Sequence, residues 1–360
     1  MNTPFEPDYR HLQEAAWNRR PARLPLYEHI ICAEIMEKIL GTAFAGLYHS
    51  DRPADLAGFF REHCRFFREM TYDTVSFEVC VNDLTPGGGA LLGECEGVIR
   101  NRADFESWPW EDFPRMFWEH AGPRFDALAA AMPPGMKAVG GIGNGVFEIS
   151  EDLVGFENLC YMQEDDPELF AALYQRIGGM LEGLWTTFLE RYGDTYCVAR
   201  IGDDLGFKTS TLIQSDSLIR HVIPQYERII RRVHAAGLPY LQHSCGKIFA
   251  VMDAWIGAGI NAKHSNEDAV APYDEWIARY GDRIGLFGGI DTDRVCRMVP
   301  AELFDFVVES GTRFRQTARG YALGSGNSIP DYVPVDGYLA MVRGAQEIRR
   351  RERATELLSK

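Results

Sequence analysis

PYLQHSCGKIFAVMDAWIGAGINAKH, residues 239–264, contains two short apolar runs with a helical segment between them. We interpret 239–244 and 259–264 as strands, because each is a short apolar run that turns polar at its end. Gly259 fits the end of the connecting helix, where a C-terminal cap favours glycine. The stretch therefore predicts a strand–helix–strand unit with parallel strands.

The same alternation runs along the whole chain. It predicts eight strands, at 24–30, 74–80, 137–143, 196–203, 239–244, 259–264, 284–289 and 320–324. Apolar residues recur at helical spacing between them, at 54–70, 113–132, 168–192 and 217–236. Eight such units in 360 residues predict an α/β protein with one (β/α)8 TIM barrel, and a doubly wound open sheet is the alternative. We expect an N-terminal helical extension over 1–20, the barrel over 21–345 and the end of the last helix over 346–360.

Composition excludes several partners. Lys and Arg total 37 against 52 Asp and Glu, so the net charge is −15, which argues against a nucleic-acid or anionic membrane surface. No run of about 18 apolar residues exists that would span a membrane. The N-terminus lacks the apolar core of a signal peptide, and the eight cysteines form no C-x-x-C pair. We expect a reduced cytoplasmic protein that acts on a small molecule.

Polar residues gather where the predicted strands end. They are Glu28, His29, Asp203, Asp204, His243, Cys245, His264, Glu267, Asp291, Ser325 and Asn327. Because the carboxyl ends of barrel strands build one face, these residues predict a polar pocket there. Asp203 and Asp204 are neighbouring carboxylates, which raise each other's pKa and suit acid–base catalysis. The alternative is that residues such as Asp204 and Asp291 cap the following helices.

The most specific single motif is His243-Ser244-Cys245-Gly246. Residues i and i+2 of a strand point to the same face, so the imidazole of His243 and the thiol of Cys245 lie together. These two groups are typical zinc ligands. The alternative is a core histidine beside an inert buried cysteine. His264 or Glu267, at the next strand end, would add a third ligand, or else serve as a helix cap or hydrogen-bond partner.

Four linked motifs resemble the uroporphyrinogen decarboxylase superfamily across about residues 20–345. They are RIGDDLGFKTSTLIQSDSLIRHVIPQYERII at 200–230, LQHSCGKIFAVMDAWIGAGINAKHSNEDA at 241–269, IGLFGGIDTDRV at 284–295 and YALGSGNSIPDYVPVDGY at 321–338. The resemblance implies a (β/α)8 barrel. It also implies one of two chemistries: cofactor-free decarboxylation of uroporphyrinogen III, or zinc-dependent methyl transfer with corrinoid proteins.

The N-terminal segment is more similar to the methyltransferase branch. True decarboxylases of the superfamily carry the motif P-x-W-x-M-R-Q-A-G-R, whose arginines hold substrate carboxylates. The equivalent segment here, RRPARLPLYEH at 19–29, ends in Glu28 and His29 without an arginine pair. A substrate with eight carboxylates would lack its bidentate partners in such a pocket.

In the methyltransferase branch the H-x-C pair supplies two zinc ligands, which implies this role for His243 and Cys245. A cysteine in a later S-x-G-C-type motif supplies the third, and this sequence has Asn327 there. With one thiolate fewer, a bound zinc would be a stronger Lewis acid, suited to a methoxy or alcohol oxygen. Glu267 or Asp204 would complete its ligand set.

The resemblance to this branch therefore implies a methyltransferase that moves a methyl group between a small methoxy or methyl-thiol compound and a corrinoid protein. The expected metal ligands are His243, Cys245 and Glu267, and the expected catalytic residues are Asp203, Asp204 and His264. The expected substrate-binding residues are Glu28, His29, Asp291, Ser325 and Asn327. Barrels of this kind pair through their outer helices, so a homodimer is one assembly we consider. The alternatives are decarboxylation of uroporphyrinogen III or a related carboxylated substrate, and a non-catalytic barrel that binds a tetrapyrrole or corrinoid.

Overall fold

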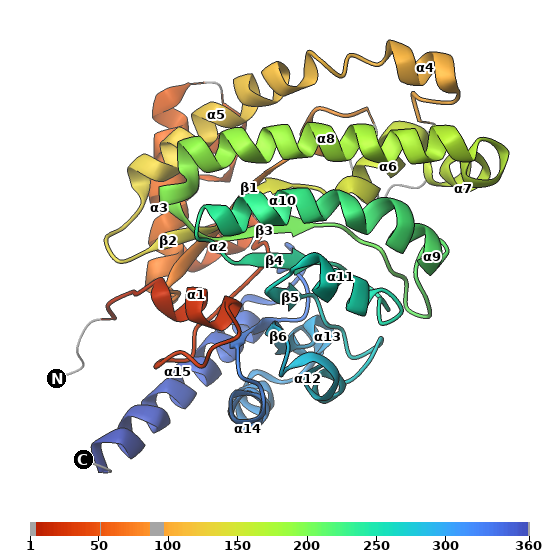
Figure 1. Ribbon diagram of the computed structural model, residues 1–360. Helices are drawn as coiled ribbons and strands as arrows, with labels where there is room; N and C mark the ends of the chain where they lie inside the picture. Colours follow the sequence, from red (N-terminus) through yellow and green to blue (C-terminus); the bar gives the residue numbers. More distant parts are fainter. Residues whose placement is uncertain (1–4, 51, 87–96, 359–360) are drawn as a thin grey trace.

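Seven parallel strands form one curled, barrel-like sheet in the computed structural model, which describes residues 5–50, 52–86 and 97–358 (Figure 1). The strands follow one another in chain order: β1 Thr74–Cys80, β2 Lys137–Gly143, β3 Tyr196–Gly202, β4 Tyr240–His243, β5 Ala262–His264, β6 Gly285–Ile290 and β7 Tyr321–Ser325. All seven coincide with predicted strands. A doubly wound sheet would reverse its strand order at a switch point, and this sheet does not.

The predicted first strand, 24–30, does not form a regular strand, so the expected eight-stranded ladder is corrected to seven strands. Its segment lies between the two edges of the sheet instead. Leu26 and Ile31 make isolated parallel bridges to Leu323 and Ile329. On the other side, the Ser76 hydroxyl of β1 donates to the His29 carbonyl at 2.6 Å. Prolines such as the one at position 25 have no N–H for a ladder, which helps to keep this pairing irregular.

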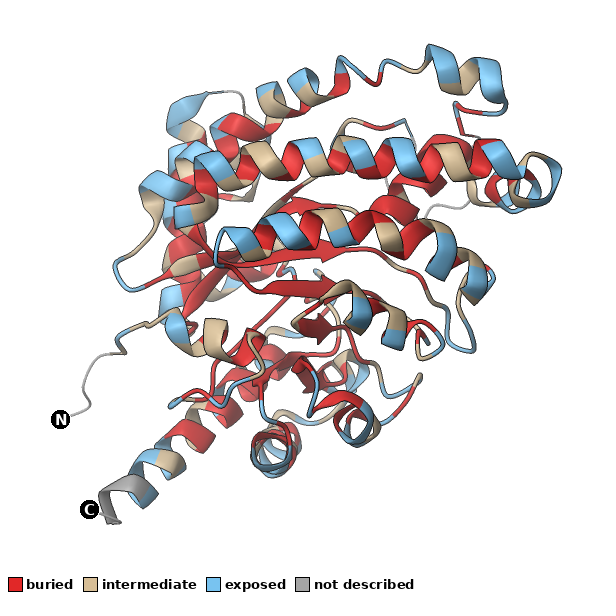
Figure 2. Cartoon of the chain, viewed as in Figure 1, coloured by how far each residue is buried: buried red, intermediate tan, exposed pale blue. Residues whose placement is uncertain are grey.

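Helices cover the outside of the sheet. Figure 1 shows α8 and α10 along the outside of the sheet, and Figure 2 shows strands that are almost entirely buried and helices buried on their inner sides. The helices are α1 Arg10–Ala16, α2 Ala33–Leu40, α3 Pro53–Glu69, α4 Arg102–Ser107, α5 Phe113–Ala131, α6 Val146–Val154, α7 Phe156–Asp165, α8 Pro167–Tyr192, α9 Ser215–Ser217, α10 Ile223–Ala235, α11 Met252–Ala258, α12 Tyr273–Tyr280, α13 Thr292–Arg297, α14 Pro300–Thr317 and α15 Val335–Leu358. Shorter turns are η1 Ala45–His49, η2 Val81–Asp83, η4 Gly193–Thr195 and η5 Leu218–Val222.

Helix α1 closes the amino-terminal end of the sheet. Leu12 and Ala15 are buried against side chains from inside the barrel, and Gln13 donates to the Cys197 carbonyl at the start of β3 at 3.1 Å. A Cβ atom on Gly285 would come within 2.3 Å of the Ala15 carbonyl, so glycine permits this close approach. The carboxyl ends of the strands lie at the opposite end of the sheet, where a functional site can form.

Residues 1–4 of the predicted extension and 359–360 of the predicted final helix lie outside the described residues. The seven cysteines that the structure describes are all free thiols. Within the same residues, no helix has both the length and the apolar character needed to cross a bilayer.

Candidate functional site

A cavity of about 610 Å³ lies at the carboxyl ends of the strands. The strand register aligns Gly202 with His243 and His243 with His264, so the ends of β3, β4 and β5 lie level with one another. Six predicted site residues line the cavity: His29, Asp204, His243, Cys245, Glu267 and Asn327. Four others, Glu28, Asp203, His264 and Ser325, are buried behind it, and Asp291 lines a neighbouring cavity of about 360 Å³.

His243, Cys245 and Asp204 bring three ligand atoms within 4.8 Å of one another. Cys245 Sγ lies 3.5 Å and Asp204 Oδ1 lies 3.9 Å from His243 Nε2. The Cys245 backbone N–H donates to Asp204 Oδ1 at 2.8 Å, which fixes that carboxylate beside the thiol. In a tetrahedral zinc site, bond lengths of about 2.3 Å to sulfur and about 2.0 Å to nitrogen separate the two ligand atoms by about 3.5 Å. The observed sulfur–nitrogen separation therefore fits such a site.

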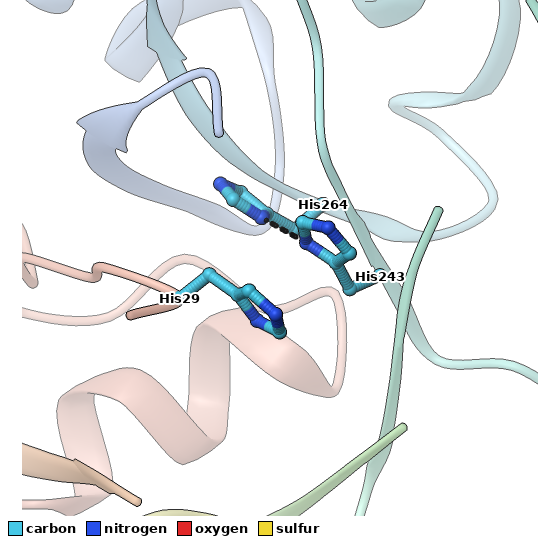
Figure 3. A group of neighbouring side chains, drawn as sticks. All are labelled: His29, His243 and His264. Carbon is cyan, nitrogen blue, oxygen red and sulfur yellow. Dashed lines mark hydrogen bonds between the residues drawn. The ribbon is translucent and has the colours of Figure 1, made fainter. Parts of the chain in front are cut away.

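A hydrogen-bonded relay sets the tautomer of His243. His264 Nε2 lies 3.0 Å from the Ser325 carbonyl, which can only accept, so this nitrogen carries the proton. His264 Nδ1 then accepts from His243 Nδ1–H at 2.8 Å, as Figure 3 shows. The remaining nitrogen of His243, Nε2, keeps its lone pair and faces Cys245 and Asp204. This is the arrangement that orients a metal-ligating histidine.

The pKa values of both imidazoles of the relay are lowered, which favours their neutral forms. Burial lowers the pKa of His264 to about 3 and holds the pKa of His243 well below its ordinary value. His29 stacks on His243 with ring centroids 3.7 Å apart, and the three imidazoles also lie within ligand distance of one another. In that second group, however, Nδ1 of His243 and Nδ1 of His264 already share a proton. The thiol-containing group thus offers the freer set of ligands.

Asn327 lies beside the ligand pair, where the sequence resemblance places it. Its side-chain nitrogen is 3.5 Å from Cys245 Sγ and donates to Glu267 Oε1 at 2.8 Å. Among the described residues, Asp204 rather than Glu267 belongs to the group within ligand distance of His243 and Cys245. Asp204 is thus better placed than Glu267 as the third ligand.

Asp203 points away from the cavity although its neighbour Asp204 points into it. Asp203 accepts hydrogen bonds from the backbone N–H groups of Phe147 and Glu148, at 3.1 and 2.9 Å, and from the Tyr226 hydroxyl. It thereby satisfies donors of the first turn of α6, which have no partner within the helix. Burial raises the pKa of its carboxyl group. Its position is that of a structural cap.

Three other predicted site residues form hydrogen bonds with the protein itself: Glu28, Ser325 and Asp291. Glu28 accepts from the backbone N–H of Ser325 at 2.8 Å and from its hydroxyl, and burial raises the pKa of Glu28 to about 8. This contact holds the strand end whose carbonyl accepts from His264. Asp291 accepts from the Asp293 N–H at 2.7 Å and caps α13, the role that the helix-cap alternative assigned to it.

An internal ion pair was missed by the sequence reasoning. Arg200 of β3 is completely buried, and its guanidinium donates to Glu78 Oε2 of β1 at 2.8 and 3.0 Å. It also donates to the Tyr27 hydroxyl at 3.0 Å and to the His29 carbonyl at 2.9 Å, which ties the irregular 24–31 segment to the sheet. A charged residue in each of two otherwise apolar strands, TVSFEVC and YCVARIG, was the signal available in the sequence.

The cavity wall is acidic. Its carboxylates come from Glu78, Glu148, Glu151, Asp204 and Glu267. Lys208 is the only lysine or arginine among the described residues that line this cavity. Arg200 is engaged by Glu78 and does not offer its guanidinium to the cavity. A ligand with many carboxylates would therefore meet repulsion here.

Comparison with known proteins identifies the fold. No family model matches the sequence, and no curated protein sequence matches it. Among solved structures, a methyltransferase from Methanosarcina mazei shares 14% identity with a TM-score of 0.71, over 94% of this chain and 97% of that one. In fold, the chain is similar to a methyltransferase. At this identity the likeness concerns the fold, which is the barrel-like α/β fold that the sequence resemblance implies.

Two other solved structures have lower TM-scores. A B12-independent methionine synthase from Shewanella sp. W3-18-1 has 14% identity and a TM-score of 0.41, over 68% of each chain. Xylanase B from Clostridium stercorarium F9 has 10% identity and a TM-score of 0.39, over 62% of this chain and 83% of that one.

Proposed function

We propose that this protein is a zinc-dependent methyltransferase that moves a methyl group between a small methylated compound and a corrinoid protein. His243, Cys245 and Asp204 would hold the metal. The observation that carries the proposal is the position of His243 Nε2, which faces the Cys245 thiol at a separation suited to zinc and the Asp204 carboxylate at 3.9 Å. The fold similarity to the M. mazei methyltransferase supports it.

The residues present fit a zinc ion with three protein ligands and one position open to the cavity, as in catalytic zinc sites. Bound zinc supplies Lewis acidity toward a methoxy, alcohol or thiol group of the substrate. Burial and the Asp204 carboxylate raise the pKa of the Cys245 thiol well above its ordinary value. The thiol therefore gives up its proton on metal binding and not before, so metal uptake releases a proton.

The chain's other residues have separate tasks in this proposal. His264 holds His243 in the ligating tautomer, and Asn327 donates toward the Cys245 sulfur from the position of the missing cysteine. Proton handling, which the sequence assigned to Asp203 or Asp204, passes to Glu148. Glu148 lines the cavity, whereas Asp203 is enclosed behind it.

Exposed apolar side chains at the cavity mouth support a macromolecular partner. Ile30 and Phe207 line the cavity and are 46% and 59% exposed, and Tyr332 of the adjoining cavity is 71% exposed. Clustered apolar side chains around a polar opening are typical of a docking surface. A corrinoid protein bound over this mouth would bring its cobalt to the substrate.

Metal content tests the proposal. Protein purified with zinc and a reductant should contain about one zinc per chain, and His243→Ala and Cys245→Ala should each lose it. Cys160→Ala is the matched control, because Cys160 is an exposed thiol of α7 outside the cavity. Zinc-loaded protein should then methylate a reduced corrinoid from methoxylated donors, followed by the absorption of the cobalt. Zinc retained in both variants would contradict the assignment of the ligands.

A further inference from the structure

The acidic wall of the cavity includes a carboxylate that has no partner. Glu151 of α6 is 8% exposed and lines the cavity. Its side chain makes no hydrogen bond or ion pair with any residue that the structure describes. The charged groups that act on it are Asp203, Asp204 and Asp152, all of the same sign. A buried carboxylate without a partner is costly, so the position calls for a ligand that satisfies it.

Burial and these neighbours raise the pKa of Glu151 to about 9, so a cation bound beside it stabilises the carboxylate form and binds with release of a proton. A raised pKa is typical of a buried carboxyl group that no positive charge faces. The single lysine of the lining, Lys208, is exposed and belongs to the loop that follows β3. Glu148, one helical turn before Glu151, faces the same cavity and places a second carboxyl group there.

Aromatic rings face the same space. Phe156, the first residue of α7, and Phe207 both line the cavity with Glu151. The face of an aromatic ring attracts a cation, and alkylated ammonium groups are bound in this way between aromatic and acidic side chains. An anionic ligand would be repelled by the carboxylates of this wall, and a neutral one would not offset their charge.

We propose that the cavity takes a substrate with a cationic head group, an ammonium or sulfonium, held between Glu151 and the rings of Phe156 and Phe207. This deepens the proposed function by naming its substrate class, and it rests on that function only in treating the bound cation as the methylated compound. Binding of the cation itself requires the carboxylate and the rings, and not the zinc ligands.

Three probes of nearly the same shape test the proposal: choline, its neutral isostere 3,3-dimethyl-1-butanol, and anionic 3,3-dimethylbutanoate. Their affinities for the full-length, zinc-supplemented protein are measured by titration calorimetry, and the zinc content of each sample is recorded. Choline should bind at least about tenfold more tightly than the alcohol, a difference of about 1.4 kcal/mol. The butanoate should bind most weakly.

Glu151→Gln should remove most of the preference for choline and leave the affinity for the alcohol unchanged. Glu151→Asp, which keeps the charge, should retain the preference. Glu157→Gln is the matched control, because Glu157 is an exposed acid on α7 outside the cavity lining. Thermal unfolding verifies that each variant is folded.

Equal binding of choline and the alcohol would overturn the proposal, as would tighter binding of the butanoate or no binding of choline. A preference for choline that survives Glu151→Gln would also overturn it. The zinc record separates the two proposals. A preference for choline in protein that binds no zinc would contradict the proposed methyltransferase and leave the cation site standing. Bound zinc without a preference for choline would contradict the cation site and leave the proposed methyltransferase standing.

Discussion

Replacing His264 with phenylalanine should weaken zinc binding although His264 is not among the proposed ligands. The change removes the acceptor for His243 Nδ1–H, which lies 2.8 Å away in a completely buried setting. His243 is then free to rotate or to adopt the other tautomer, and its buried N–H loses its partner. Loss of such a supporting hydrogen bond typically lowers metal affinity by about 10- to 100-fold, or about 1.4 to 2.8 kcal/mol.

The assay is a competition titration of zinc between the protein and a chromophoric chelator. His63→Phe is the matched control, because His63 is also buried but bonds to the Ser76 carbonyl outside the relay. His264→Gln should restore most of the affinity, because its amide offers both an acceptor for His243 and a donor for the Ser325 carbonyl. Unchanged zinc affinity in folded His264→Phe would refute the relay, as would an equal loss in His63→Phe.

Three further changes give separate tests. Asn327→Cys places a thiol beside Cys245 and should raise zinc affinity in the same competition titration; a lower affinity would show that position 327 does not face the metal. Arg200→Met leaves the Glu78 carboxylate buried without its partner and should lower the free energy of unfolding by about 3–5 kcal/mol in urea titration, whereas a change near zero would show that the pair is not needed for stability. Because burial raises the pKa of Glu28 to about 8, the folded chain binds more protons than the unfolded chain between the unfolded pKa of 4.5 and that value. Its contribution to stability is therefore lost as pH rises through this window. The free energy of unfolding should accordingly fall less steeply with pH in Glu28→Gln than in the unchanged protein, and identical slopes would contradict the assignment.

The seven strands were predictable because each is a short apolar run that turns polar or glycine-rich at its end. The first segment, 24–30, has the same local pattern. Its state depends on contacts that no local pattern encodes. These are the bridges to Leu323 of β7 and to Ile329 beyond it, nearly 300 residues later, and the hydrogen bond from the Arg200 guanidinium across the barrel. Sequence periodicity reports which face of a segment is apolar, and not whether its backbone finds a regular partner.

The site was partly predictable for a similar reason. His243 and Cys245 lie two residues apart at a strand end, so one element is enough to bring them together. Asp203 and Asp204 could not be told apart, because neighbouring residues point to opposite sides and the register of the strand end decides which one enters the cavity. The role of Glu151 depends on how α6 packs over the strand ends, which only the tertiary structure reveals.

The most direct test of the central claim is X-ray absorption at the zinc edge of the zinc-loaded protein. The account predicts one sulfur ligand at about 2.3 Å, with nitrogen and oxygen ligands at about 2.0–2.2 Å completing a four-coordinate site. Cys245→Ser should remove the sulfur signal. A zinc spectrum without sulfur, a spectrum with two or more sulfur ligands, or a wild-type protein that binds no zinc would contradict the account.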